Sequence, residues 1–157
     1  MIGAVIAAFG LGFVGGLRSM TAPAVVAWAA AMGWMRLGNS PLAFMGSRWA
    51  VAIFTVAALG EFVADLLPIA PARTKPFPLS ARIIVGLFTG ASVAFAGGFA
   101  LWFGMLWGAL GAVAGAFGGY RARVGLVRKL RVPDAVIAIP EDILAVSTGL
   151  LLAFTLK

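Results

Sequence analysis

One stretch of the chain is apolar, uncharged and too long to form a single secondary-structure element. No charged residue lies between Arg82 and Arg121. About 20 apolar residues are enough for a helix to cross the hydrocarbon core of a bilayer, so the stretch predicts two membrane helices joined by a tight turn. Gly97-Gly98 marks the turn, which gives helices over about 83–95 and 100–117.

The composition extends this interpretation to the whole chain. Of its 157 residues, 62% are hydrophobic and only 11% are charged, with a mean hydropathy of +1.07. Soluble domains are about a quarter charged, so the sequence predicts an all-α polytopic transmembrane helix bundle in one domain over 1–157. The 21 glycines allow close helix packing, and we expect a homo-oligomer.

The charge balance and the missing residue types narrow the function classes. The net charge of +7 comes from basic residues that flank apolar segments, which favours membrane lipids and not nucleic acid as partners. The chain has no Cys and no His, so it lacks thiol chemistry, a Ser-His-Asp triad and the commonest transition-metal ligand. We therefore expect no catalytic residue, no cofactor and no metal site, and we do not expect an enzyme.

Further apolar segments predict the remaining helices, some of them short or broken. They cover 2–17, 21–35, 49–67 and 134–157. The four prolines within 68–78 predict a stiff extended loop, and the basic segment 120–131 predicts an amphipathic element lying in the headgroups. The bundle has six helices if 21–35 crosses the membrane, which we favour, and five if that segment is re-entrant.

The positive-inside rule predicts the orientation. Loops 68–80 and 120–133 hold most of the basic residues, so both should face the cytoplasm of a bacterial inner membrane. The C-terminus is then outside. The N-terminus is outside if 21–35 crosses and inside if it does not.

The first polar cluster is Arg18 with Ser19 and Thr21, between two apolar helices. A guanidinium beside hydroxyls and free amides at a helix start is suited to binding an anion. Ser19 or Thr21 is also expected to act as the N-cap of the second helix. The alternative is that Arg18 only marks the membrane boundary.

A short internal repeat adds Arg121 to this candidate substrate-binding set. Segment 13–19 resembles segment 116–122, since both are glycine-rich and contain Gly-Gly-x-Arg. Duplicated halves with a site at their interface are typical of transporters.

Glu61 and Asp65 share one helix face, four residues apart, near a helix C-terminus that disfavours negative charge. Their charge must be balanced by Arg18, by a cation, or by a salt-bridge partner in the following segment, for which the candidates are Arg73, Lys75 and Arg82. Two interpretations remain open. The acids form a site for a coupling ion or for gating, or they form a structural salt-bridge lock.

Glu141 and Asp142 follow Pro140 in the last apolar segment. Adjacent helical residues point in different directions, so the two acids are not expected to share one partner easily. If the helix begins at Glu141, one acid caps it. If it begins at Asp134, an acid lies within the membrane and is a candidate for ion coupling or gating.

Three motifs together resemble a family of small bacterial integral-membrane proteins of unknown function. They are Gly16-Leu17-Arg18-Ser19-Met20-Thr21-Ala22-Pro23, Glu61-x-x-x-Asp65-x-x-Pro68, and Pro71-x-Arg73-Thr74-x-Pro76-x-x-Leu79-x-x-Arg82. The resemblance covers most of residues 10–90. It implies a membrane fold and marks these residues, but it implies no substrate.

The sequence favours a small transporter or channel for a small solute, an anion being one candidate, with ion or proton coupling. The alternative is a non-transporting scaffold or lipid-binding protein, in which the charges serve only topology and salt bridges. A membrane enzyme acting on lipid headgroups is a third, weaker interpretation, because the chain has no His.

Overall fold

The computed structural model describes residues 2–38, 40–65 and 73–157, which form helices and connecting turns without any strand. The elements are α1 (Ile2–Leu17), α2 (Thr21–Ala31), η1 (Ala43–Gly46, a 3-10 helix), α3 (Arg48–Asp65), α4 (Pro76–Gly97), α5 (Leu101–Leu130) and α6 (Asp134–Phe154). The prediction of an all-α helix bundle is confirmed.

Among the described residues, three helices are long and apolar enough to cross a membrane: α4, α5 and α6. The helices α1 and α2 are apolar but shorter, and they form a hairpin inside the bundle. Leu17, the last residue of α1, packs against Gly119 of α5, and α5 continues for about 16 Å beyond that point. The turn between α1 and α2 therefore lies within the depth of the bundle.

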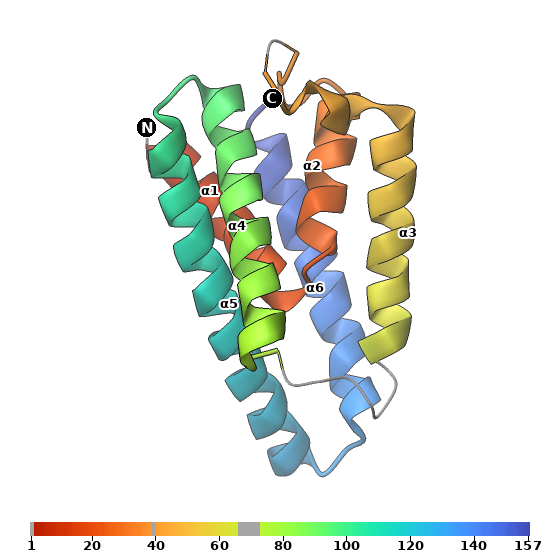
Figure 1. Ribbon diagram of the computed structural model, residues 1–157. Helices are drawn as coiled ribbons and strands as arrows, with labels where there is room; N and C mark the ends of the chain where they lie inside the picture. Colours follow the sequence, from red (N-terminus) through yellow and green to blue (C-terminus); the bar gives the residue numbers. More distant parts are fainter. Residues whose placement is uncertain (1, 39, 66–72) are drawn as a thin grey trace.

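Successive helices alternate in direction (Figure 1). The helices α1, α3 and α5 run one way, and α2, α4 and α6 run the other way. Both chain termini consequently lie at the same end as the turn between α4 and α5. The basic end of α5 lies at the opposite end, together with the start of α4 and the start of α6.

Glycine contacts bring α1, α4 and α5 together at backbone distance. A Cβ placed on Gly12 of α1 would lie closer than 3.0 Å to the carbonyl of Gly108 in α5. A Cβ on Gly108 would in turn meet the carbonyl of Gly86 in α4, and Gly90 and Gly104 face each other in the same way. Such small-residue interfaces are typical of membrane bundles, where close backbone approach replaces the hydrophobic effect.

The expected break between a helix ending near 117 and a separate segment 120–131 is wrong. The structure shows α5 as one helix from Leu101 to Leu130. Gly118 and Gly119 do not end it, because Gly119 is buried against Leu17 and no proline follows before Pro133. The helix ends at Leu130, because the next residue, Arg131, takes a left-handed conformation with φ of 54°.

The predicted proline loop 68–78 is too long at its C-terminal end. Pro76 and Pro78 lie in the first turn of α4, where the missing N–H of proline has no helical acceptor to lose. Residues 66–72 lie outside the described residues. The predicted turn at Gly97-Gly98 is confirmed, with Gly98 at a positive φ of 64°, whereas the second helix ends at Ala31 and not at 35.

The two segments of the internal repeat pack against each other but differ in conformation. Gly111, Gly115 and Gly119 of α5 face Phe9, Phe13 and Leu17 of α1, so the two helices run in parallel with a constant offset. The chain turns at Arg18 but remains helical at Arg121. The similarity therefore reflects the glycine pattern of one tight helix pair.

Candidate functional site

Arg18 follows the last residue of α1, and its side chain is fully buried, at 0% exposure. Its guanidinium forms ion pairs with Asp65 of α3 and with Asp142 of α6. Glu141 Oε2 lies 3.7 Å from Arg18 Nη2, and the ring of Phe62 lies 5.9 Å from the guanidinium carbon. Three carboxylates thus offset the cost of removing this charge from water.

Glu61 closes the turn between α1 and α2 from outside. Its Oε1 accepts hydrogen bonds from Ser19 N at 2.8 Å and Ser19 Oγ at 2.7 Å, and its Oε2 accepts one from Met20 N at 2.8 Å. The predicted N-cap role of Ser19 or Thr21 is wrong, because Met20 holds that position and no side chain caps it. A carboxylate from α3 satisfies the free amides of the turn instead.

Arg82 links α4 to the end of α1. Its Nε donates to the carbonyl of Gly16 at 3.1 Å, and its Nη1 donates to the carbonyl of Pro78 at 3.2 Å. Its Nη2 lies 3.6 Å from Glu61 Oε1. Arg82 therefore binds one of the unpaired carbonyls at the C-terminal end of α1 and supports the carboxylate that holds the turn.

Glu141 and Asp142 lie about two turns inside α6, because that helix begins at Asp134. Arg73 donates from Nη1 to Glu141 Oε1 at 2.6 Å and from Nη2 to Oε2 at 3.1 Å. The expectation that the adjacent acids would not share a partner is wrong, since both approach Arg18. The three nitrogens of a guanidinium allow this sharing.

Arg123 of α5 is shared by three carboxylates. Its Nη1 lies 3.2 Å from Asp65 Oδ2 and 3.4 Å from Glu141 Oε2. Its Nε donates to Asp134 Oδ1 at 2.8 Å, and its Nη2 pairs with the other oxygen of Asp134. Arg73 Nη2 also lies 3.5 Å from Asp65 Oδ2. These contacts connect Arg18 and its carboxylate partners to the end of the bundle where α6 begins.

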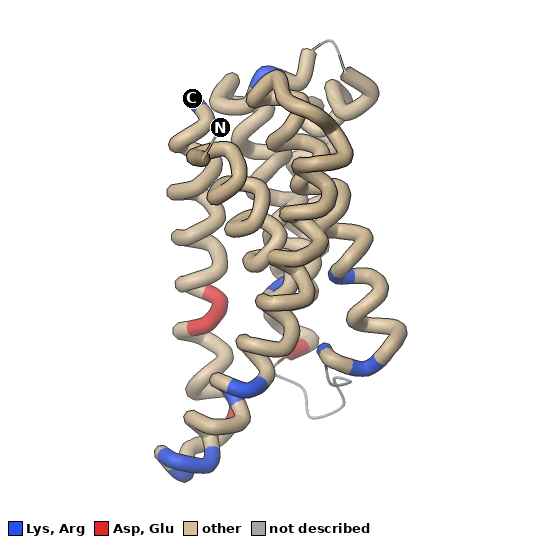
Figure 2. The backbone as a smooth tube through the Cα atoms, turned by 90° about the vertical axis from the view of Figure 1, so that its left-hand side faces the viewer, with Lys and Arg blue, Asp and Glu red and all other residues tan. Residues whose placement is uncertain are grey.

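These ion pairs and hydrogen bonds define what we call the charge network. Its members are Arg18, Arg73, Arg82, Arg123, Glu61, Asp65, Asp134, Glu141 and Asp142. It contains all 5 acidic residues of the chain, and the tube view shows them within the lower part of the bundle (Figure 2). Asp134 is the most exposed carboxylate at 59%, so the network reaches from solvent to the fully buried Arg18.

The structure brings most of the predicted site residues into the network or onto the turn that it holds. Arg121 and Lys75 are exposed and form no ion pair with any described residue. Thr21 is buried at the start of α2, and within the described part of the chain its hydroxyl has no hydrogen-bond partner. The described residues contain no group of three carboxylates that could hold a metal ion.

Two network members were missed by the sequence interpretation, Arg123 and Asp134. A usable signal exists for Arg123, because it continues the small-residue stripe of α5 by one helical repeat after Ala116 and Gly119. That stripe faces α1, so a charged residue that extends it points toward the Arg18 turn. Arg121 is off the stripe. Asp134 opens α6 and meets Arg123 only through the turn at 131–133.

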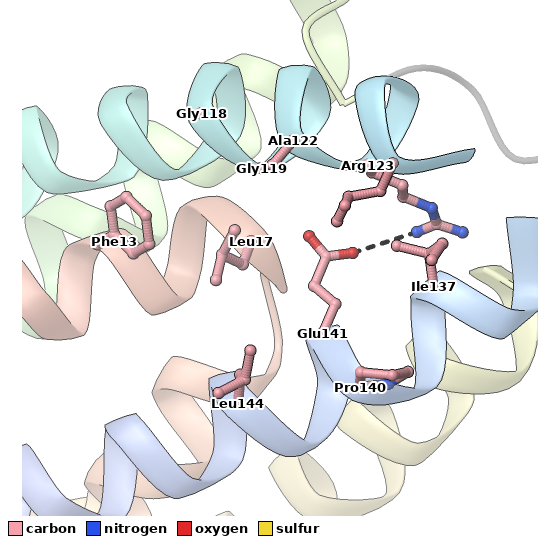
Figure 3. A pocket seen from close by; sticks show the side chains of 11 residues that line it. Phe13, Leu17, Gly118, Gly119, Ala122, Arg123, Ile137, Pro140, Glu141 and Leu144 are labelled. Atoms are coloured by element: carbon pink, nitrogen blue, oxygen red, sulfur yellow. Dashed lines mark hydrogen bonds and ion pairs between the residues drawn. The ribbon is translucent and has the colours of Figure 1, made fainter. Parts of the chain in front are cut away.

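A pocket of about 440 Å³ adjoins the network between α1, α5 and α6 (Figure 3). Most of its walls are apolar, and Glu141 and Arg123 form its one charged side. Its lining residues are Phe13, Leu17, Gly118, Gly119, Ala122, Arg123, Leu126, Ile137, Pro140, Glu141 and Leu144. Gly118, Ala122, Leu126, Pro140 and Leu144 are exposed on the bundle surface, so the pocket opens sideways.

Comparison with known proteins places the chain without giving it an activity. Neither the curated proteins nor the solved structures include a significant match. A family model described as a domain of unknown function, DUF4126, matches residues 5–156, which is nearly the whole bundle. A resemblance to an uncharacterised family is thereby confirmed, and the chain belongs to the DUF4126 family.

Proposed function

We propose that the protein is a small transporter of the bacterial inner membrane whose charge network binds and releases a proton or a monovalent cation. The observation that carries the proposal is the ratio of charges, with five carboxylates sharing four guanidiniums. Residues 66–72 contain no charged side chain, so the sequence adds nothing to that count.

The surplus of carboxylate is concentrated around Arg123. Asp65 and Glu141 share its Nη1 at 3.2 and 3.4 Å, whereas Asp134 binds two other nitrogens. If Asp65 or Glu141 takes up a proton, Arg123 therefore keeps Asp134 as its partner. Breaking a buried ion pair normally costs several kcal/mol because a charge is left alone, and this arrangement avoids that cost.

The network also links the parts of the bundle that would have to move. Its members come from α3, α4, α5, α6, the segment before α4 and the turn between α1 and α2. Helices interrupted at membrane depth beside a charged site are a recurring feature of transporters. Arg18 is fully buried among three carboxylates, so the geometry favours a cation or a proton over an anion at this site.

Electrical recording on reconstituted protein tests the proposal. Proteoliposomes on a solid-supported membrane should give a transient current after a pH or Na⁺ jump, because charge enters the network. Glu141→Gln should reduce the current to that of empty liposomes, whereas Arg121→Gln, which changes an exposed residue outside the network, should retain it. No current from the wild-type protein with either ion would contradict the proposal.

A second candidate is a non-transporting scaffold or lipid-binding protein, and one observation favours it. Both oxygens of Glu61 are occupied by the turn at Ser19 and Met20, as expected for a static lock. In this case Glu141→Gln would lower the melting temperature, and neither the wild type nor the variant would show an ion-dependent signal. The melting temperatures of the wild type and the variant across pH and Na⁺ distinguish the two candidates, because a bound ion stabilises the folded state.

The proposed orientation places the basic end of α5 in the cytoplasm, following the positive-inside rule. The chain has no native cysteine, so single cysteines report its topology directly. Gly38 lies in the segment after α2 and Gly125 lies in the last two turns of α5, and the C-terminal ends of these two helices are at opposite ends of the bundle (Figure 1). A Cβ at either position meets no atom within 4 Å. A membrane-impermeant thiol reagent applied to intact cells should label Gly38→Cys and spare Gly125→Cys. The reverse pattern would invert the orientation.

A further inference from the structure

We infer that the pocket between α1, α5 and α6 binds a monovalent organic cation with an apolar body, and that this cation is the transported solute. The inference rests on the proposed function and specifies the substrate class. It starts from the position of the pocket, whose apolar walls adjoin the charged side formed by Glu141 and Arg123 (Figure 3).

The size and access of the pocket fit such a solute. A volume of about 440 Å³ lies within the usual range for small-molecule sites. Leu144 is 64% exposed and Leu126 is 43% exposed, so these walls of the pocket also form part of the bundle surface. Leu144 lies in α6, a candidate membrane span, so in a membrane this wall faces hydrocarbon and an apolar solute can enter from the lipid without crossing water.

The charges decide the sign of the solute. The network carries one more carboxylate than guanidinium, so a monovalent cation beside it completes the balance and an anion worsens it. Phe13 adds an aromatic wall, and aromatic faces attract cations.

The contacts of Glu141 show how a cation could be accepted. Arg73 holds its Oε1 at 2.6 Å and its Oε2 at 3.1 Å, and Oε2 also meets Arg123 at the longer distance of 3.4 Å. Arg123 has Asp134 as an alternative partner, through Nε at 2.8 Å and through Nη2. A cation in the pocket can therefore replace Arg123 at Oε2 without leaving the guanidinium unpaired.

Two ions of matched shape and opposite charge test the inference. We expect the full-length protein in detergent to bind radiolabelled tetraphenylphosphonium, after subtraction of empty micelles, and to bind tetraphenylborate at least about tenfold more weakly, since a difference of that size needs only one favourable charge contact. Equal or tighter binding of the borate would overturn the assignment of charge. No binding of the phosphonium ion would overturn the inference itself.

A matched pair of glycine variants locates the site. Gly118 lines the pocket and Gly125 does not, although both lie on α5 and a Cβ on either meets nothing within 4 Å. Gly118→Leu should weaken phosphonium binding at least about tenfold by filling the pocket, whereas Gly125→Leu should bind like the wild type. Equal binding by both variants would place the ion elsewhere and overturn the inference.

Glu141→Gln should also weaken phosphonium binding, and the Gly118 pair keeps the test valid if that variant does not fold. The inference and the proposed function fail in different ways. If pH or Na⁺ jumps still give currents but phosphonium does not bind, the substrate class is wrong and the proposed function stands. If the currents are absent, the proposed function fails whatever binds in the pocket.

Discussion

Replacing Gly108 with alanine is expected to lower the melting temperature of the bundle far more than a methyl group added at Gly118 or Gly125 of the same helix. The new Cβ would lie closer than 3.0 Å to the carbonyl of Gly86 and at about 3.0 Å from the Cα of Gly90. Both neighbours are backbone atoms of α4, so no side chain can rotate away. Overpacking usually costs roughly 1–3 kcal/mol, and this contact should lie at or above the upper end of that range.

Thermal unfolding of detergent-solubilised protein, followed by circular dichroism, measures the effect. Gly118→Ala and Gly125→Ala are the matched controls, because a Cβ at either position on the same helix meets nothing within 4 Å. Alanine has the higher helix propensity, by about 1 kcal/mol, so the controls should melt at or above the wild-type temperature. A Gly108→Ala variant that melts with the controls would show that α4 and α5 do not approach as closely as described.

Apolar block length was enough to predict the fold class, but it did not place every helix end. Uninterrupted apolar sequence fixes membrane helices because lipid offers the backbone no hydrogen-bond partners. Apolar block length could not predict the end of α5. Its glycines look like a break in isolation, but Gly119 is held against α1, and the helix continues into its basic segment.

Most members of the charge network could be identified from the sequence, because charged residues are rare in this chain and each one needs a partner. Which residues pair with which could not be predicted. A basic residue or a cation was expected to balance Glu61, and Arg82 does lie 3.6 Å away, yet its nearest partners are the hydroxyl of Ser19 and the amides of Ser19 and Met20. Spacing reveals which residues share a helix face, but it does not reveal which helices are neighbours. For that reason Arg123 was missed, whereas Arg121 was chosen from the internal repeat.

The second large effect is expected at Arg18. Arg18→Met replaces the arginine with an apolar side chain of similar length. The change removes the only ion-pair partner that Asp142 has among the described residues. Asp65 retains Arg123 at 3.2 Å and Arg73 at 3.5 Å, so most of the loss falls on Asp142. Removing one partner of a buried ion pair costs about 3–5 kcal/mol, whereas Arg121→Met at an exposed position should cost within about 0.5 kcal/mol.

Arg18→Lys should fall between the wild type and Arg18→Met in melting temperature. The guanidinium pairs with Asp142 through Nε and with Asp65 through Nη1, and a single ammonium cannot occupy both positions. A lysine variant as stable as the wild type would mean that Arg18 acts as a simple positive charge, as in the interpretation of this residue as a boundary marker.

The double variant Arg18→Met, Asp142→Asn separates the structural role of Arg18 from its functional role. Because Asp142 loses most from Arg18→Met, neutralising it should recover much of the lost stability, with a coupling energy of roughly 0.5–3 kcal/mol. An unchanged melting temperature relative to Arg18→Met would instead assign the loss to Asp65 or to the turn between α1 and α2. If stability recovers but the ion-dependent current does not, the buried Arg18–Asp142 pair is needed for coupling as well as for folding. If both recover, the Arg18–Asp142 pair is a replaceable lock, and coupling must depend on the carboxylates around Arg123.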